Sequence, residues 1–279
     1  MLFMRSTDFI YILWKKEQKV YNKNLTVLKQ NPCKEPVHDL RVAIKKLRAA
    51  LKLYFLISEK PFPENFLKDT EQLFSISGKQ RDIEICLEII DTFQKDSGKK
   101  YPELKNYFSS VLAVTYKWTK NAVGQYRKKE LENLVLPVKT EKPETGEDEL
   151  KNKVAAIINF HLAGCRDLFN KPHKLRQSLK EIYYWIKMIP ESLFNGAELE
   201  KELNPLLDDF GNWQNLTVFE IKLKHFRKDY LPKTFPEYEV TKMLEAEVKY
   251  KKDKLLKIAL NKTSSLLRKA IEKEKPQEN

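Results

Sequence analysis

The clearest structural signal in the sequence is the segment Val37-His38-Asp39-Leu40-Arg41-Val42-Ala43-Ile44-Lys45-Lys46-Leu47-Arg48-Ala49-Ala50-Leu51-Lys52, which predicts an amphipathic helix. At about 100° per residue, one sector of roughly 80° holds the basic side chains His38, Arg41, Lys45, Arg48 and Lys52. Another face holds the apolar side chains that a core would bury, namely Leu40, Ala43, Ile44, Leu47, Ala50 and Leu51. Surface helices usually mix acids with bases, because like charges at i,i+3 and i,i+4 cost on the order of 0.2–0.5 kcal/mol. Since the basic sector contains no acid, it predicts a partner that supplies negative charge.

A second segment repeats this pattern about 135 residues later. Its residues are Pro172-His173-Lys174-Leu175-Arg176-Gln177-Ser178-Leu179-Lys180, with the same His-x-x-Arg-x-x-x-Lys spacing. The basic face continues to Lys187, and Tyr183 stands where the first copy has Arg48. Three more pairs of segments keep nearly the same offset: Gly78-Lys79-Gln80-Arg81-Asp82 with Gly211-Asn212-Trp213-Gln214-Asn215, Tyr101-Pro102-Glu103 with Phe235-Pro236-Glu237, and Tyr116-Lys117-x-x-Lys120 with Tyr250-Lys251-x-x-Lys254. The shared offset predicts an internal duplication whose halves pack with pseudo-two-fold symmetry.

The composition is typical of a globular, helical protein with a polyanionic partner. The chain has 279 residues, of which 42% are hydrophobic and 33% charged, so it can bury a sizeable core. It has only 7 glycines, and no segment alternates apolar and polar residues as a strand would. The formal net charge of +13 favours nucleic acid, an acidic membrane surface or a phosphate polymer as the partner.

The cysteines indicate a reducing compartment. Cys33, Cys86 and Cys165 are odd in number and widely spaced, so they predict neither a disulfide framework nor a zinc site. The apolar segment 9–14 is far too short to span a membrane, and its flanks do not suit a signal peptide. We expect a cytoplasmic protein without membrane insertion.

These patterns predict an all-α protein with five helices in each half. The first helical repeat is expected at residues 1–136, a linker at 137–149 and the second repeat at 150–279, the two repeats together forming one domain. Gly78 is expected to end the third helix as a C-cap, and Asp82 to start the fourth as an N-cap. The expected helices are 7–30, 36–58, 64–77, 82–94 and 101–133, followed by 148–170, 172–189, 197–210, 215–227 and 236–271.

Several of these segments resemble the CHAD domain, the conserved-histidine α-helical domain. The resemblance lies in His38-Asp39-Leu40-Arg41-Val42-Ala43-Ile44-Lys45-Lys46-Leu47-Arg48, in Gly78-x-x-Arg81-Asp82 and in the repeated His173-x-x-Arg176-x-x-x-Lys180. It implies two pseudo-symmetric helical bundles with a basic groove or channel between them, and binding of inorganic polyphosphate at polyphosphate granules. It also implies a phosphate-binding surface made of His38, Arg41, Lys45, Arg48, His173, Arg176 and Lys180. Tyr183 in place of Arg48, and Gln214-Asn215 in place of Arg81-Asp82, predict weaker binding by the second half.

The full predicted site is larger than the residues that the resemblance supplies. Lys52 and Lys187 extend the two basic faces, and four lysines recur in both halves, namely Lys117, Lys120, Lys251 and Lys254. A solvated surface explains these last four equally well. No cofactor, metal ligand or catalytic residue is expected, and the oligomeric state is not predicted.

Two other functions compete with polyphosphate binding. An RNA- or DNA-binding helical module fits the net charge, but single-strand binders interleave aromatic residues with basic ones, and the two basic faces contain only Tyr183. A polyphosphatase or other metal-dependent phosphohydrolase would need clustered acids to hold a metal ion, and the basic faces lack them. Polyphosphate suits the pattern better, because Arg can meet two phosphate oxygens while Lys acts as a mobile point charge.

Overall fold

The structure is a computed structural model that describes residues 8–31, 33–62, 67–126 and 146–274. All regular elements in these ranges are helices. In the first half they are α1 (Asp8–Gln30), α2 (Lys34–Ile57), α3 (Lys68–Ser97) and α4 (Pro102–Gln125). In the second half they are α6 (Glu147–Gly164), the short 3-10 helix η1 (Cys165–Leu168), α7 (Pro172–Met188), α8 (Ala197–Asp229) and α9 (Glu237–Glu274). The all-α prediction is confirmed.

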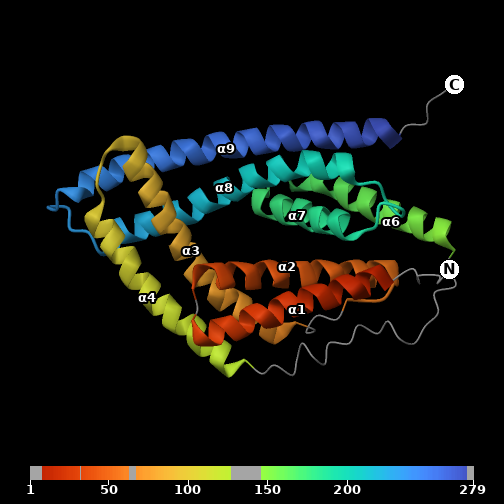
Figure 1. The fold of residues 1–279 in the computed structure, drawn as a ribbon. Coiled ribbons are helices and arrows are strands. Elements are labelled where there is room, and N and C mark those ends of the chain that lie inside the picture. The colour runs from red at the N-terminus through yellow and green to blue at the C-terminus, as the bar shows by residue number, and fades with distance from the viewer. Residues whose placement is uncertain (1–7, 32, 63–66, 127–145, 275–279) are drawn as a thin grey trace.

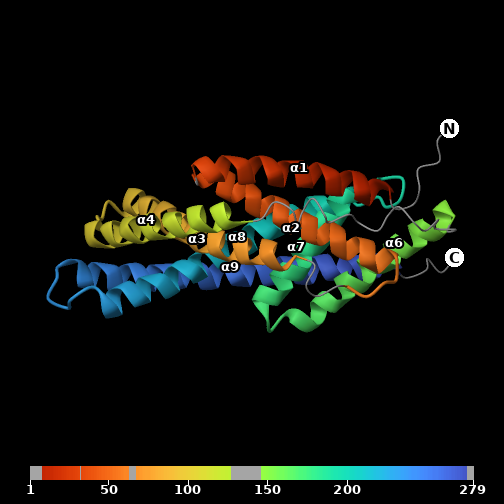
Figure 2. The same ribbon diagram turned by 90° about the horizontal axis from the view of Figure 1, so that it is seen from below.

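Antiparallel hairpins dominate the architecture. Helices α8 and α9 form a long hairpin that runs along the molecule, and α1 pairs with α2 on one side of α7 (Figure 1). Helices α3 and α4 form a third hairpin near the end where α8 turns into α9 (Figure 2). Helix α2 packs against α7, and α3 packs against α8, so both contacts join the two halves of the chain. No helix in the described ranges has the length and apolar run needed to cross a membrane.

Two apolar clusters hold these helices together. The larger cluster contains α1, α2, α6 and α7 with the start of α8 and the end of α9, and the smaller one joins α3 and α4 to the rest of α8 and α9. Leu40, Ile44 and Leu47 of α2 are completely buried in the larger cluster, as the apolar face predicts. Each contributes about 1.5–3 kcal/mol to folding through burial. Trp185 of α7 joins them, and its Nε1 donates a hydrogen bond of 2.9 Å to the carbonyl of Ala49.

Helices α3 and α8 are each continuous where the sequence predicts a break. Gly78 and Asp82 lie inside α3, and Gly211 and Asn215 lie inside α8, so the predicted caps are wrong and each pair of helices predicted around a glycine forms a single helix. A glycine within a helix costs only about 1 kcal/mol, and apolar residues on both sides of each glycine are buried in the core. The left-handed C-cap of α3 is Gly98, with φ of 69°.

The predicted linker lies largely outside the described residues, as does the predicted end of α4 at residue 133. Residues 147–149 of that linker form the first turn of α6, which is rich in acids. Acidic side chains favour a helix N-terminus because they interact with its partial positive charge. The helix that the sequence predicts at 148–170 therefore begins one residue earlier, inside the predicted linker.

Glu237 connects the two halves at the start of α4. Its buried carboxylate accepts hydrogen bonds from the backbone N–H groups of Glu103, at 2.8 Å, and Leu104, at 3.0 Å. Tyr101, the N-cap residue of α4, makes no side-chain capping bond of its own. A carboxylate from α9 therefore caps a helix of the other half of the chain.

We expect Glu237→Ala to lower the free energy of unfolding by about 1–2 kcal/mol, because two backbone donors of α4 lose their acceptor. Urea denaturation measures this change. The matched control is Glu239→Ala, since Glu239 lies in the same first turn of α9 but is exposed. Equal losses in the two variants would show that the capping bonds do not stabilise the fold.

Candidate polyanion-binding site on helices α2 and α7

Three predicted cations of α2 gather around one aromatic ring of α3. The Arg41 guanidinium lies 3.9 Å from the centroid of the Phe74 ring, that of Arg48 lies 4.6 Å from it, and the Lys45 ammonium lies 5.8 Å from it. The ring face attracts cations through its negative electrostatic potential, with a strength of about 0.5–2 kcal/mol. Sequence analysis missed Phe74, because a single aromatic residue in a helix carries no pattern that indicates this contact.

The backbone of α3 fixes the position of Arg41. Its Nη1 donates hydrogen bonds to the carbonyl of Phe74 and, at 3.4 Å, to the hydroxyl of Ser77. A Cβ atom at Gly78 would lie 2.8 Å from the same Nη1. Gly78 is therefore needed for the close approach of a guanidinium, and not for the helix end that the sequence predicts.

Lys45 is repelled by cations from both halves of the chain. The pKa of Lys45 is lowered from 10.5 to about 7, mainly by burial and then, in decreasing order, by the charges of Lys180, Arg41, Arg176 and Arg48. Two of these charges belong to α7, so the basic faces of α2 and α7 lie within electrostatic range of each other. Among the described residues, Lys45 has no ion-pair partner that would offset this repulsion.

Arg176 and Lys180 of α7 are half-buried in the same way. The pKa of Lys180 is lowered to about 8, mainly by burial and then by the charge of Arg176, while Asp208 opposes the change. The Lys180 ammonium lies 5.8 Å from the centroid of the Tyr184 ring, and burial raises the pKa of Tyr184 to about 12. Neither Lys180 nor Arg176 forms an ion pair with any residue in the described ranges. Tyr184 is a second aromatic neighbour of the site that the sequence did not reveal.

One arginine from each face has a buried donor without an acceptor. The Nε atoms of Arg48 and Arg176 are buried, and neither has a hydrogen-bond partner among the described residues. An unsatisfied buried donor usually costs about 1–3 kcal/mol. Phosphate oxygens are strong acceptors for such guanidinium groups, so the donor chemistry fits an anionic ligand.

The two predicted histidines have different surroundings. Burial lowers the pKa of His38, Arg81 lowers it further, Asp39 raises it, and Lys45 and Lys180 lower it. His173 Nδ1 lies 2.6 Å from Gln214 Oε1, and its ring centroid lies 4.6 Å from that of Trp213. Because an amide oxygen only accepts, Nδ1 carries the proton of this bond. His38 therefore lies within electrostatic range of the cations, while α8 fixes the His173 ring.

Comparison with known proteins identifies the family. The family model of the CHAD domain matches residues 17–224, which is most of the chain. The chain belongs to the CHAD domain family. The crystal structure of the CHAD domain from the plant Ricinus communis has a similar fold, with a TM-score of 0.71 and 15% identity over 95% of this chain and 92% of that chain. None of the curated proteins that were compared matches this chain.

The CHAD domain also contains acids that neutralise the outer cations of both basic faces. Lys52 pairs with Glu181 at 2.6 Å, Lys187 with Glu200 at 3.1 Å, and Arg48 with Glu71 at 3.4 Å. The expectation of an acid-free surface is therefore wrong at the ends of the two faces. Glu71 and Glu200 come from α3 and α8, and Glu181 comes from the opposite basic helix, so the periodicity of one helix could not reveal these pairs.

Within the described residues, the four recurring lysines make no contact with the cations of this site. Lys117, Lys120 and Lys254 are exposed on α4 and α9. Lys251 pairs with Glu247 at 3.0 Å, and its ammonium lies 4.2 Å from the centroid of the Phe93 ring in the smaller core cluster. Their part in ligand binding stays a prediction, with the solvated surface as the alternative.

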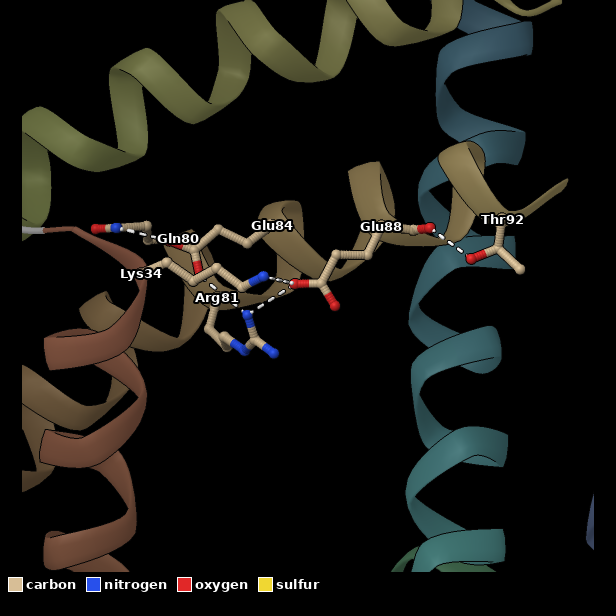
Figure 3. A network of polar contacts seen from close by, with 6 residues as sticks. All are labelled: Lys34, Gln80, Arg81, Glu84, Glu88 and Thr92. Carbon is tan, nitrogen blue, oxygen red and sulfur yellow. Dashed lines mark hydrogen bonds and ion pairs between the residues drawn. The ribbon is translucent and has the colours of Figure 1, made fainter. Parts of the chain in front are cut away.

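Arg81, from the second motif of the CHAD domain, belongs to a network of ion pairs on α3 (Figure 3). Its Nη1 lies 3.2 Å from Glu84 Oε2 and 3.1 Å from Glu88 Oε1, and Lys34 of α2 approaches Glu88 Oε1 at 2.8 Å. Gln80 Nε2 donates a hydrogen bond to Glu84 at 2.9 Å. The network ties the start of α2 to α3, so Arg81 helps to orient the helix that carries Arg41.

Asp82 is a buried counter-charge next to the site. Burial raises its pKa, while the charges of Lys222, Arg41 and Arg81 lower it. Its carboxylate therefore lies among cations from α2, α3 and α8 and does not cap a helix. In the ranges that the structure describes, no three His, Cys, Asp or Glu side chains are grouped in a way that could hold a metal ion.

Substituting the two helix-interior glycines tests the contact between Gly78 and Arg41. Gly211→Ala should raise the free energy of unfolding by about 0.5–1 kcal/mol, because nothing lies within 4 Å of the new Cβ and Ala favours a helix. Gly78→Ala should instead lower it by about 1 kcal/mol, because the Arg41 guanidinium must leave its acceptors. Urea denaturation measures both changes.

A third variant separates this contact from the helix propensity of Ala. When Arg41 is already replaced by Ala, the guanidinium no longer lies against Gly78. Gly78→Ala should then raise the free energy of unfolding by as much as Gly211→Ala does. If Gly78→Ala stabilises the otherwise unchanged protein as well, the close approach of Arg41 to α3 is contradicted.

The pKa of Lys45 predicts how stability depends on pH. The folded state releases the Lys45 proton near pH 7, whereas the unfolded chain keeps it to about pH 10.5. Between these values the unfolded chain binds more protons, so the free energy of unfolding rises with pH. In Lys45→Met, the free energy of unfolding should rise less between pH 7 and about pH 9. Loss of the Lys180 proton should account for part of the rise that remains. Urea denaturation at each pH checks this, with Lys16→Met on the exposed face of α1 as the control. An unchanged rise in Lys45→Met would contradict the buried, repelled state of Lys45.

Proposed function

We propose that this CHAD domain binds inorganic polyphosphate through Arg41, Lys45 and Arg48 of α2 together with Arg176 and Lys180 of α7. One observation carries the proposal: Lys45 lies among cations of α2 and α7, beside the same Phe74 ring as Arg41 and Arg48, and has no acidic ion-pair partner in the described part of the chain. A bound anion would offset this repulsion and restore the charge of Lys45. The family match and the resemblance of the two histidine segments to polyphosphate-binding CHAD domains support the same conclusion.

The donor set suits a flexible chain of phosphates. The guanidinium groups can donate paired hydrogen bonds to phosphate oxygens, and the two lysines can follow the chain as point charges. The faces come from different halves of the protein, so successive phosphates can contact α2 and α7 in turn. His38 and His173 lie at the N-terminal ends of the two faces, where an approaching anion would favour their protonated forms.

The repeated segments favour a duplicated architecture around this site. The paired segments of the sequence fall in α2 and α7, in α3 and α8, and in or just before α4 and α9. Equivalent residues thus occupy helices in the same order, with Gly78 and Gly211 both inside long helices. We infer that the halves are related by duplication and pseudo-two-fold symmetry, and that the basic faces form a groove between them.

The proposed activity is binding without hydrolysis, at polyphosphate granules in the cytoplasm. Nucleic acid is the main competitor for the same cations. Single-stranded nucleic acid usually stacks its bases on aromatic rings, but the Phe74 ring is already in contact with Arg41 and Arg48. Polyphosphate has no bases to stack and needs only the charges.

Replacing the central lysines of the two faces tests the proposal. Lys45→Ala with Lys180→Ala should weaken binding of polyphosphate of defined length by about tenfold or more, because two charge-assisted contacts are lost. The dependence of affinity on salt should also become shallower, since fewer counterions are released. Isothermal titration calorimetry at two or more salt concentrations measures both effects.

Three controls make the result specific. Lys16→Ala with Lys19→Ala removes two exposed lysines of α1 and should leave binding unchanged. The unfolding free energy of the Lys45→Ala/Lys180→Ala variant should rise at pH 7, because repulsion between buried cations is removed, so weaker binding would not reflect misfolding. RNA of equal charge should not displace bound polyphosphate. Efficient displacement by RNA, or release of orthophosphate from polyphosphate with magnesium, would contradict the proposed function.

A further inference from the structure

A second group of cations surrounds a cavity where α8 ends and α9 begins. The cavity has a volume of about 530 Å³ and is lined by Lys224, Arg227, Lys228, Leu231, Pro232, Lys233 and Tyr238. Both ribbon views place the α8–α9 connection at one end of the molecule, away from α7 (Figures 1 and 2). Its size is within the range of about 300–1,000 Å³ that is typical of small-molecule sites. None of its lining residues belongs to the polyphosphate site proposed above.

Two of the four cations are already paired. Arg227 Nη2 lies 2.6 Å from Glu245 Oε2, and Lys224 Nζ lies 2.7 Å from Glu220 Oε1. Lys228 and Lys233 are exposed, and neither has an ion-pair partner among the described residues. The cavity therefore has about two positive charges to offer a ligand. Arg227 is fixed by its pair with Glu245, so it can present its remaining donors in a defined direction.

The negative end of the α8 dipole explains only part of this cluster. Cations in the last turn of a helix are favourable there, and Arg227 and Lys228 occupy the last turn of α8. Lys233 lies beyond the helix end, yet it lines the same cavity. Leu231, Pro232 and the Tyr238 ring make up the apolar wall of the cavity, and the centroid of the Tyr238 ring is 5.8 Å from the Arg227 guanidinium.

We propose that this cavity binds an organic phosphate, with the phosphate groups at Lys228 and Lys233 and a flat apolar part against Tyr238. The two unpaired cations match the charge of a short phosphate chain. The apolar wall distinguishes this ligand from inorganic polyphosphate, which has no surface to bury there. A nucleotide combines both features, because its base can stack on an aromatic ring and its phosphates can reach the lysines.

Calorimetry on the full chain with ATP as the probe tests this site. The Lys45→Ala/Lys180→Ala variant serves as the background, so that binding to the faces of α2 and α7 is suppressed. In this background, Lys228→Glu with Lys233→Glu should weaken ATP binding by about tenfold or more. Lys16→Glu with Lys19→Glu reverses the same charge on α1 and should leave ATP binding unchanged.

Two further measurements test the apolar half of the proposal. Tripolyphosphate, which has the phosphates of ATP but no base, should bind about tenfold more weakly than ATP, because base–aromatic contact is lost. Tyr238→Leu should remove most of this difference. Equal affinity for tripolyphosphate and ATP would overturn the assignment to an organic phosphate. Absence of ATP binding at millimolar concentration, or equal losses in the two charge-reversed variants, would overturn the site itself.

Discussion

Repulsion between half-buried cations is the constraint on which the structure of this CHAD domain depends. The charge of Lys180 lowers the pKa of Lys45 across the contact between α2 and α7, and partial burial removes some of the water that would screen this repulsion. The opposite sides of these helices are packed in the large core cluster, where Leu40, Leu47 and Trp185 are completely buried. Apolar packing thus holds together two faces that their charges alone would separate.

The neighbouring helices determine which cations have a polar or acidic partner. Helix α3 supplies the Phe74 ring and the acceptors that fix Arg41, and the missing side chain at Gly78 makes that approach possible. At the other end of the faces, Glu181 binds Lys52 and joins α2 to α7 directly. The central cations stay without acidic ion-pair partners among the described residues, while the outer ones are paired. Positive charge without an acidic partner is therefore concentrated in the middle of the two faces.

Interactions within one helix could be predicted from the sequence, and interactions between helices could not. The apolar and basic faces of α2 follow from residue spacing alone, because the helical period fixes which side chains share a side. The contacts of Phe74, Tyr184 and Glu181 depend on how separate helices pack. No local sequence pattern encodes that packing. A glycine at position 78 indicates a special backbone position, and the sequence alone therefore predicts a helix end there. The structure shows instead that Gly78 makes room for Arg41 of another helix.

The two halves contribute unequally to the proposed site, and the difference begins at one position. Arg48 of α2 contacts Phe74 and has a buried Nε without an acceptor among the described residues, whereas Tyr183 occupies the equivalent position in α7. The Tyr183 hydroxyl donates a hydrogen bond of 3.1 Å to Asn204, and the Lys187 ammonium lies 5.4 Å from its ring centroid. The hydrogen bond to Glu200 is the main cause of the raised pKa of Lys187, in contrast to the lowered pKa of Lys180. Beyond Lys180 the face of α7 therefore satisfies its own polar groups, whereas α2 keeps at the equivalent position a guanidinium with a buried donor that has no acceptor among the described residues.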